Sequence, residues 1–304
     1  MMTRREKNAA LDDITAALNK SYAGDFGIND AEDDAMPSRA EVIDVTERLL
    51  ELLFPGFDRA GVYPGTRVLL GDIMRKLSDQ IGRAMRRTKG GECESCDQEC
   101  SNLSDKLTFI LLKSLPELRD ILRSDVEAAY NGDPAARNYD EIILSYPGLK
   151  AIAIQRLAHV LFTAEVPLIP RMMTEYAHSE TGIDIHPGAT LGKGIFIDHG
   201  TGVVIGETAV LGNNVRIYQG VTLGAVSFPQ NACGVLIKGL RRHPTIGSNV
   251  TIYSGASVLG DITIGDDSVI GGNVWLTESL PPGTKITALP PEHRRKSLNG
   301  NNAK

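Results

Sequence analysis

The strongest constraint on the fold is a six-residue repeat of aliphatic side chains in the C-terminal part of the chain. Thirteen positions in this repeat are all Ile, Leu or Val, and Gly often follows directly. They are Ile185, Leu191, Ile197, Ile205, Leu211, Ile217, Leu223, Ile246, Ile252, Val258, Ile264, Ile270 and Leu276. A period of six fits neither a helix nor an ordinary strand. It is typical of a parallel β-helix, in which each hexad forms a strand and a corner and three hexads complete a coil.

Two interruptions of the repeat mark candidate functional loops. The segment DHGTGVV adds two residues after Ile197, and the segment after Leu223 adds about 17. Insertions in a solenoid become surface loops, often on the binding face. Each interruption carries a histidine beside a charged residue, His199 in the first and His243 in the second. A histidine near its ordinary pKa is the natural general base at neutral pH.

The other four histidines have plainer interpretations. We expect His159 to pack in a helix, His178 to be structural at the domain junction, His186 to lie at a corner and His293 to lie in a basic tail.

The rest of the chain divides into further segments. Residues 1–38 are polar and acidic, which predicts a flexible lead-in. From 39 to 180, apolar residues recur at three- and four-residue intervals, which predicts an α-helical domain. Within it, Ser114 and Pro116 predict the start of a helix. The β-helix is placed at 181–280 and a C-terminal tail at 281–304, so the predicted fold class is α + β.

Composition and charge argue against several classes of function. The formal net charge is −6, whereas nucleic-acid-binding proteins usually present a basic face. No apolar run reaches the roughly 18 residues that a membrane span needs. The start, MMTRREKNAALDD, lacks the apolar core of a secretory signal. We therefore expect a cytoplasmic protein without a nucleic-acid or membrane partner.

The four cysteines leave two interpretations open. Cys93, Cys96 and Cys100 form a cluster, and Cys233 stands alone. In a cytosolic chain such a cluster can hold a metal or an iron–sulfur centre, but it offers three thiolates and no nearby histidine as a fourth ligand. The alternative is three reduced thiols in a polar loop between helices.

The repeat also places candidate residues at the corners of the β-helix. Asp184 directly precedes Ile185, and His199 approaches the same corner one coil later. A carboxylate there can accept a ring N–H of the histidine, which fixes its tautomer and favours the imidazolium. The alternative is a structural aspartate that caps backbone N–H groups. His243 falls at another corner, up to roughly 20 Å away at the rise of a strand. The two histidines would then meet only across a subunit interface, unless the long loop folds His243 back.

These motifs resemble those of the serine O-acetyltransferases, a family of hexapeptide-repeat enzymes. The matching segments are TGIDIHPGATLGKGIFIDHGTGVVIGETAVLG, YQGVTLGA and RRHPTIG, behind a helical region that contains GDPAA. The resemblance covers about residues 102–280. It implies a left-handed β-helix, acetyl-CoA as donor, L-serine as acceptor, and the first step from serine to cysteine. It also implies a homo-oligomer built from trimers. Whether trimers pair into hexamers, and whether L-cysteine binds as a feedback inhibitor, stays open.

The resemblance also implies the roles of the catalytic and ammonium-binding residues. His199 of DHGTG resembles the base that deprotonates the serine hydroxyl, and Asp184 of DIHP resembles its orienting partner. Asp198 and Asp133 of GDPAA resemble the carboxylates that hold the substrate ammonium. Direct attack on a CoA thioester needs no metal, so none is expected as a cofactor.

The remaining positions concern the substrate carboxylate and the cofactor. Arg242 of RRHP matches the residue that faces the carboxylate, with His243 as a second polar contact. Ala225 and Ser254 are the positions expected to bind acetyl-CoA, although many members have glycine in place of Ala225. The loop before RRHP is longer than in the best-known bacterial members. The end SLNGNNAK lacks the terminal isoleucine with which many members enter O-acetylserine sulfhydrylase, which argues against that complex.

Three other functions share parts of the pattern. An acetyltransferase for a sugar or antibiotic hydroxyl would keep the repeat and the histidine base but would not need Asp133, Asp198 and Arg242. A γ-type carbonic anhydrase shares the fold but binds zinc through three histidines, and the paired spacing for these is missing here. A scaffold solenoid without turnover would have no need of Asp184 and His199 at one corner.

Overall fold

The computed structural model describes residues 2–23, 36–57, 63–88, 96–227, 235–237 and 239–289, with only the backbone described for 96–100. The interpretations of the four cysteine thiols, of His293 and of the end of the tail fall outside the described residues. Among the residues described, no helix combines the length and the apolar character that a membrane crossing requires. The chain forms two compact units, residues 1–36 and 37–304.

The first unit contains a helix where the sequence predicts a flexible lead-in. Helix α1 spans Arg4–Tyr22 and none of its residues is buried. It begins with a capping box, because the Glu6 N–H donates to the Thr3 hydroxyl and the Glu6 carboxylate accepts from the Thr3 N–H at 2.6 Å. These two bonds satisfy backbone donors that a helix start leaves unpaired, and they account for the start of α1.

The structure describes six helices in the N-terminal part of the second unit. They are α2 (Arg39–Leu53), α3 (Thr66–Thr88), α4 (Cys96–Gly132), α5 (Tyr139–Ser145), α6 (Pro147–Thr163) and α7 (Ile169–Thr181). The predicted helix start at Ser114 is wrong, because α4 runs through it and the Ser114 hydroxyl donates to the Leu111 carbonyl at 2.8 Å. The buried stripe of Leu111, Leu115 and Leu118 continues across this point, and Pro116 is accommodated inside the helix.

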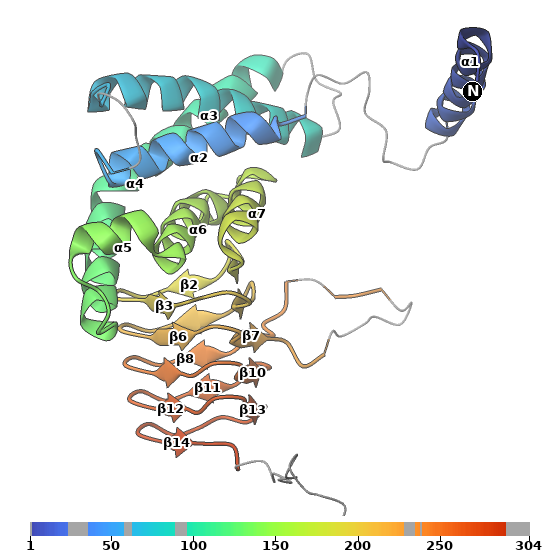
Figure 1. The fold of residues 1–304 in the computed structure, drawn as a ribbon. Helices are drawn as coiled ribbons and strands as arrows, with labels where there is room; N and C mark the ends of the chain where they lie inside the picture. Colours follow the sequence, from blue (N-terminus) through green and yellow to red (C-terminus); the bar gives the residue numbers. More distant parts are fainter. Residues whose placement is uncertain are drawn as a thin grey trace, which may run out of the picture. The chain divides into compact units, whose positions relative to one another are not determined.

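A parallel β-solenoid of about five turns follows the helices, as Figure 1 shows. Sheet A contains β1 (Asp184–Ile185), β4 (Val204–Ile205), β7 (Thr222–Gly224), β10 (Ser257–Leu259) and β13 (Trp275–Leu276). Sheet B contains β2 (Thr190–Leu191), β5 (Val210–Leu211), β8 (Thr245–Ile246) and β11 (Thr263–Ile264). Sheet C contains β3 (Phe196–Asp198), β6 (Arg216–Tyr218), β9 (Thr251–Ile252), β12 (Val269–Ile270) and β14 (Lys285–Ile286).

The predicted register of the repeat is confirmed. Aliphatic positions assigned to one face pair across adjacent coils, for example Ile197 with Ile217 and Ile205 with Leu223. Twelve of the thirteen positions are buried, and Leu191 is partly buried. Strand β14 pairs with β12, so the last strand of the solenoid lies inside the segment expected to be a tail.

A buried ion pair ties the helices to the first coil. Arg156 of α6 donates to the Asp125 carboxylate of α4 at 2.9 and 3.0 Å, and their side chains are 5% and 0% exposed. Arg156 also donates to the Gly192 carbonyl at 2.6 Å, while the Ile195 N–H donates to Asp125 at 2.8 Å. The guanidinium of Arg156 and the carboxylate of Asp125 thus have further hydrogen bonds besides those that join them, and such bonds offset the cost of burying two charges. Helices and solenoid therefore share one continuous core.

Two corners of the solenoid bound sheet A and matter for the site, and we call them its edges; the word does not refer to an outermost strand. The parallel strands of sheet A begin at the corner shared with sheet C and end at the corner shared with sheet B. We name the first corner the His199 edge, because His199 lies between β3 and β4. We name the second the His243 edge, because His243 directly precedes β8.

Candidate active site

His199 stands open to solvent in an uncommon backbone conformation. Its φ is 59°, in the left-handed region, and Gly200 and Gly202 follow it with φ of 82° and 79°. Its side chain is 70% exposed, and Nδ1 lies 3.8 Å from the Asp198 carboxylate. A non-glycine residue in this region is unusual and is often found at functional sites. The two-residue interruption thus presents an accessible imidazole at the start of sheet A.

Besides Asp198, a second carboxylate, that of Asp133, interacts electrostatically with this imidazole. The Asp133 carboxylate accepts from the Tyr146 hydroxyl at 2.5 Å and from the Ala135 N–H at 2.8 Å. The Tyr146 hydrogen bond, followed by the Ala135 N–H, holds the pKa of Asp133 below its usual value, and the nearby His199 adds to this effect. Asp198 lies beside His199, and Asp133 is near enough for its charge to interact with the ring, so negative charge suited to binding a cation gathers at this corner.

Asp184 does not form the expected contact with His199. No hydrogen bond joins their side chains in the described structure of a single chain. Instead, ligand atoms of Asp184, His178 and Glu175 all lie within 4.8 Å of one another. The backbone of Asp184 is held in sheet A by its N–H donation to the Val203 carbonyl at 2.9 Å. Helix α7 therefore supplies different neighbours for the carboxylate.

His243 lies at the opposite edge in a closed environment. Its Nδ1 accepts from the Thr208 N–H at 3.1 Å and lies 2.9 Å from the Thr208 hydroxyl, so the neutral ring carries its proton on Nε2. Burial lowers the pKa of His243 to about 4, and the charge of Arg242 adds to the shift. The ring packs directly over Gly206, where an added Cβ would come within 2.1 Å of it. His243 is thus a fixed, neutral hydrogen-bond donor at neutral pH.

Arg242 is oriented by an acidic partner that the sequence analysis missed. Its guanidinium donates to the Glu207 carboxylate at 2.5 Å and to the Leu240 carbonyl at 3.2 Å, while its N–H donates to the Thr208 hydroxyl at 3.1 Å. Although burial raises the pKa of Glu207, the hydrogen bond from Arg242 lowers it below its ordinary value. Glu207 and Thr208 follow Ile205 at the same corner as His243, so the repeat register could have identified them. Tyr146 lies outside the repeat, which carries no signal for it.

Ser254 and Ala225, the two positions expected to bind acetyl-CoA, also lie at different edges of sheet A. Ser254 lies between β9 and β10, at the His199 edge. Ala225 directly follows β7, at the His243 edge. Both are partly exposed. Within one chain, the predicted site residues therefore fall into two half-sites at opposite edges of sheet A.

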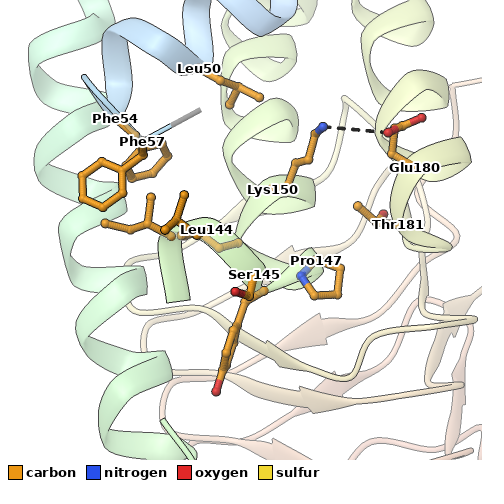
Figure 2. Close-up of a pocket in the computed structure, with 12 residues that line it drawn as sticks. Leu50, Phe54, Phe57, Leu144, Ser145, Pro147, Lys150, Glu180 and Thr181 are labelled. Atoms are coloured by element: carbon orange, nitrogen blue, oxygen red, sulfur yellow. Dashed lines mark ion pairs between the residues drawn. The ribbon is translucent and has the colours of Figure 1, made fainter. Parts of the chain in front are cut away.

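A separate cavity lies among the helices. It has a volume of about 230 Å³ and combines an apolar wall with Lys150, Glu180 and Thr181, which Figure 2 shows on neighbouring helices. None of the predicted site residues lines it, although Tyr146, the partner of Asp133, does. This cavity is therefore not the predicted site.

The zinc site of the carbonic anhydrase alternative is not seen within a chain. Among the described residues, the group close enough to share a metal is Glu175, His178 and Asp184, which includes one histidine. His199 and His243 lie at different edges of sheet A.

Comparisons with known proteins give a consistent result. The family model "Bacterial transferase hexapeptide (six repeats)" matches residues 243–278. A plasmid serine acetyltransferase of Synechococcus elongatus is 44% identical over 295 residues, covering 94% of this chain and 92% of that protein.

Two crystal structures extend the comparison to bound molecules. Serine acetyltransferase 1 of Entamoeba histolytica, in complex with L-cysteine, matches at 35% identity with a TM-score of 0.70, covering 84% of this chain and 92% of that chain. Serine acetyltransferase of Brucella abortus, in complex with coenzyme A, matches at 29% identity with a TM-score of 0.55, covering 83% and 91%.

Proposed function

The chain belongs to the serine acetyltransferase family, and we propose that it transfers the acetyl group of acetyl-CoA to the hydroxyl of L-serine. The products are O-acetylserine and CoA, and the reaction is the first step from serine to cysteine. The observation that carries this proposal is the exposed imidazole of His199, with the Asp198 carboxylate beside it and the Asp133 carboxylate near enough to interact with it. That arrangement offers a base next to a site for an ammonium group, which is what an amino-acid hydroxyl requires.

In the proposed reaction His199 acts first as a base and then as an acid. It accepts the proton of the serine hydroxyl as the oxygen attacks the thioester carbonyl. The tetrahedral intermediate collapses by breaking the C–S bond, and the imidazolium returns the proton to the CoA sulfur. Asp184 orients His199 when its carboxylate turns towards the ring. The step needs no metal and no covalent enzyme intermediate.

Substrate anchoring uses both half-sites. Asp133 and Asp198 hold the serine ammonium, and the bonds from Tyr146 and Ala135 keep Asp133 ionised and fixed. Arg242 faces the serine carboxylate, with the Nε2–H of His243 as a second donor. A charged anchor at each end of the substrate places its hydroxyl at the base.

A complete site needs residues from two chains. His199 and His243 lie at opposite edges of sheet A, and a face of six residues spans up to roughly 20 Å. A homotrimer would bring the His199 edge of one subunit to the His243 edge of the next, giving three shared sites. Ser254 and Ala225 follow the same division, so acetyl-CoA also binds between subunits. Trimers that pair into hexamers would keep these sites.

Complementation tests the shared site. His199→Ala and His243→Ala chains are unfolded together and refolded, and mixed assembly is verified with two affinity tags. The mixture should regain activity, because some interfaces carry both intact histidines. Mixed oligomers as inactive as either parent would place the site within one chain.

The activity itself is tested by thiol release from acetyl-CoA with a panel of acceptors. L-serine should be turned over. Galactosides and chloramphenicol should be poor acceptors because they lack both the ammonium and the carboxylate group, and D-serine and homoserine because they place the hydroxyl elsewhere. Preference for a galactoside or chloramphenicol would instead support the sugar or antibiotic acetyltransferase.

L-Cysteine is a second ligand of the same site. It carries the same ammonium and carboxylate groups as serine, and a relative at 35% identity has been crystallised with it. We expect inhibition that is competitive with serine. A cytoplasmic location fits these substrates.

A further inference from the structure

A group of metal-ligating side chains lies where helix α7 meets sheet A. Glu175 and His178 occupy positions i and i+3 on α7, and Asp184 begins β1. One ligand atom from each lies within 4.8 Å of the other two. A Glu-x-x-His pair on one helix is a recurrent way to present a carboxylate and an imidazole to a metal. Nδ1 of His178 and Oε2 of Glu175 are 3.4 Å apart, which is about the separation of two ligands that each lie 2.0–2.2 Å from a tetrahedral zinc ion.

The local structure holds these groups together. Gly182 ends α7 in the left-handed region with φ of 70°, which turns the chain into β1 within a few residues. Arg171 pairs with Oε1 of Glu175, while Oε2 lies 3.4 Å from Nδ1 of His178. The carboxylate of Glu175 is therefore oriented rather than free to rotate, which reduces the entropy lost on binding an ion.

Asp184 links this group to the proposed chemistry. In the described structure its carboxylate makes no hydrogen bond, and it lies beside His178 and Glu175 instead of His199. Arg171 pairs with Glu175, whereas no lysine or arginine of the described residues forms an ion pair with Asp184. An ion bound here would therefore balance the negative charge of Asp184.

We propose that Glu175, His178 and Asp184 bind one divalent transition-metal ion, best matched by Zn²⁺, and that the bound ion inhibits acetyl transfer by retaining Asp184 as a ligand. Imidazole nitrogen favours zinc over magnesium, and water completes the coordination. While Asp184 ligates the ion, it cannot orient His199. The binding part stands on its own, and the inhibitory part rests on the proposed function.

Direct binding tests the site. The full chain is titrated with Zn²⁺ against a chromophoric chelator, and then with Co²⁺, whose absorption distinguishes thiolate from nitrogen and oxygen ligands. We expect one ion per chain without thiolate absorption, and an affinity at least about tenfold weaker in His178→Ala. Glu180→Gln is the matched control, an exposed carboxylate on α7 outside the group, and should bind as the unmodified chain does. Binding unchanged in His178→Ala, or only to thiolates, would overturn the site.

Inhibition tests the link to Asp184. Thiol release from acetyl-CoA with L-serine is measured with Zn²⁺ and with chelator, and the ratio is taken within each variant. The unmodified chain and Glu180→Gln should be inhibited at the Zn²⁺ concentration that fills the site, whereas His178→Ala should need at least about tenfold more. A filled site without inhibition would overturn the coupling. Absence of turnover with serine in chelator would instead reject the proposed function and leave the binding result intact.

Discussion

The two edges of sheet A present the same side chain in opposite settings. His199 is 70% exposed on a left-handed backbone, with a carboxylate 3.8 Å from its ring. His243 is 7% exposed, bonded twice to Thr208, and burial lowers its pKa to about 4. A ring that must take and return a proton needs access to the substrate. A ring that only donates a hydrogen bond benefits from being fixed and neutral. The environments thus favour different tasks for the two histidines.

The difference arises from how the chain reaches each corner. His199 lies in a short interruption in which Gly200 and Gly202 also adopt positive φ, and its side chain is mostly exposed. His243 lies at the end of the long interruption, and its ring closes over Gly206 on the neighbouring coil. Hydrogen bonds from Thr208 and the pair between Arg242 and Glu207 then hold that end of the loop to the solenoid. We therefore call the His199 edge open, because its imidazole is exposed, and the His243 edge locked, because these contacts hold its imidazole in place.

The largest effect should come from removing the open ring. We expect His199→Ala to lower kcat by roughly 10²–10⁴-fold, the usual contribution of a general base. Asp184→Asn should cost less, because Asp184 orients the base and does not transfer the proton. Steady-state kinetics with L-serine and acetyl-CoA measure both. A near-normal kcat in His199→Ala would show that His199 is not the general base, and the different roles proposed for the two histidines would then be wrong.

The next largest effect should come from the anchor at the locked edge. Arg242→Ala should raise KM for serine by roughly 10–100-fold, since a hydrogen bond to a charged group is worth about 1.5–3 kcal/mol. KM for acetyl-CoA should change much less. Glu207→Gln keeps the arginine but weakens its support, so its effect on KM should be smaller. Equal changes in both KM values would argue against contact with the serine carboxylate.

The sequence predicted most of the solenoid because its repeat encodes register directly. Each inward aliphatic fixes a face, so His199 and His243 could be assigned to different corners before their surroundings were known. The neighbours of Asp184 could not be predicted, because they come from α7, whose approach to β1 has no counterpart in the repeat. The helix start predicted at Ser114 was wrong for a related reason. The capping pattern is local, whereas the buried stripe through Leu111 and Leu118, which continues α4 past Ser114, depends on tertiary packing.

A smaller effect should follow from loosening the locked ring without removing it. Gly206→Ala places a methyl where the His243 ring now lies, within 2.1 Å, so the ring must move. We expect KM for serine to rise by about tenfold, with little change in KM for acetyl-CoA. Gly71→Ala on α3 is the control, because its Cβ would meet only the end of the Arg67 side chain at 3.4 Å. Normal serine kinetics in Gly206→Ala would show that the position of His243 is not critical.

The last effect concerns stability instead of kinetics, and is the pH dependence contributed by His243. Its pKa in the folded chain is about 4, below the ordinary value of 6.5, because burial disfavours the charged ring. Between these values the unfolded chain binds more protons, so the free energy of unfolding falls as the pH is lowered through this range. From pH 7 to 5 the loss should be about 2 kcal/mol. Denaturant unfolding at both pH values, at one protein concentration, compares the unmodified chain with His243→Asn. Between these pH values the variant should lose about 2 kcal/mol less stability than the unmodified chain, because asparagine does not titrate. The contributions of groups that both chains share, such as His186, cancel in this comparison. The same loss in both chains would mean that His243 titrates near its ordinary pKa and is not the locked partner of the pair.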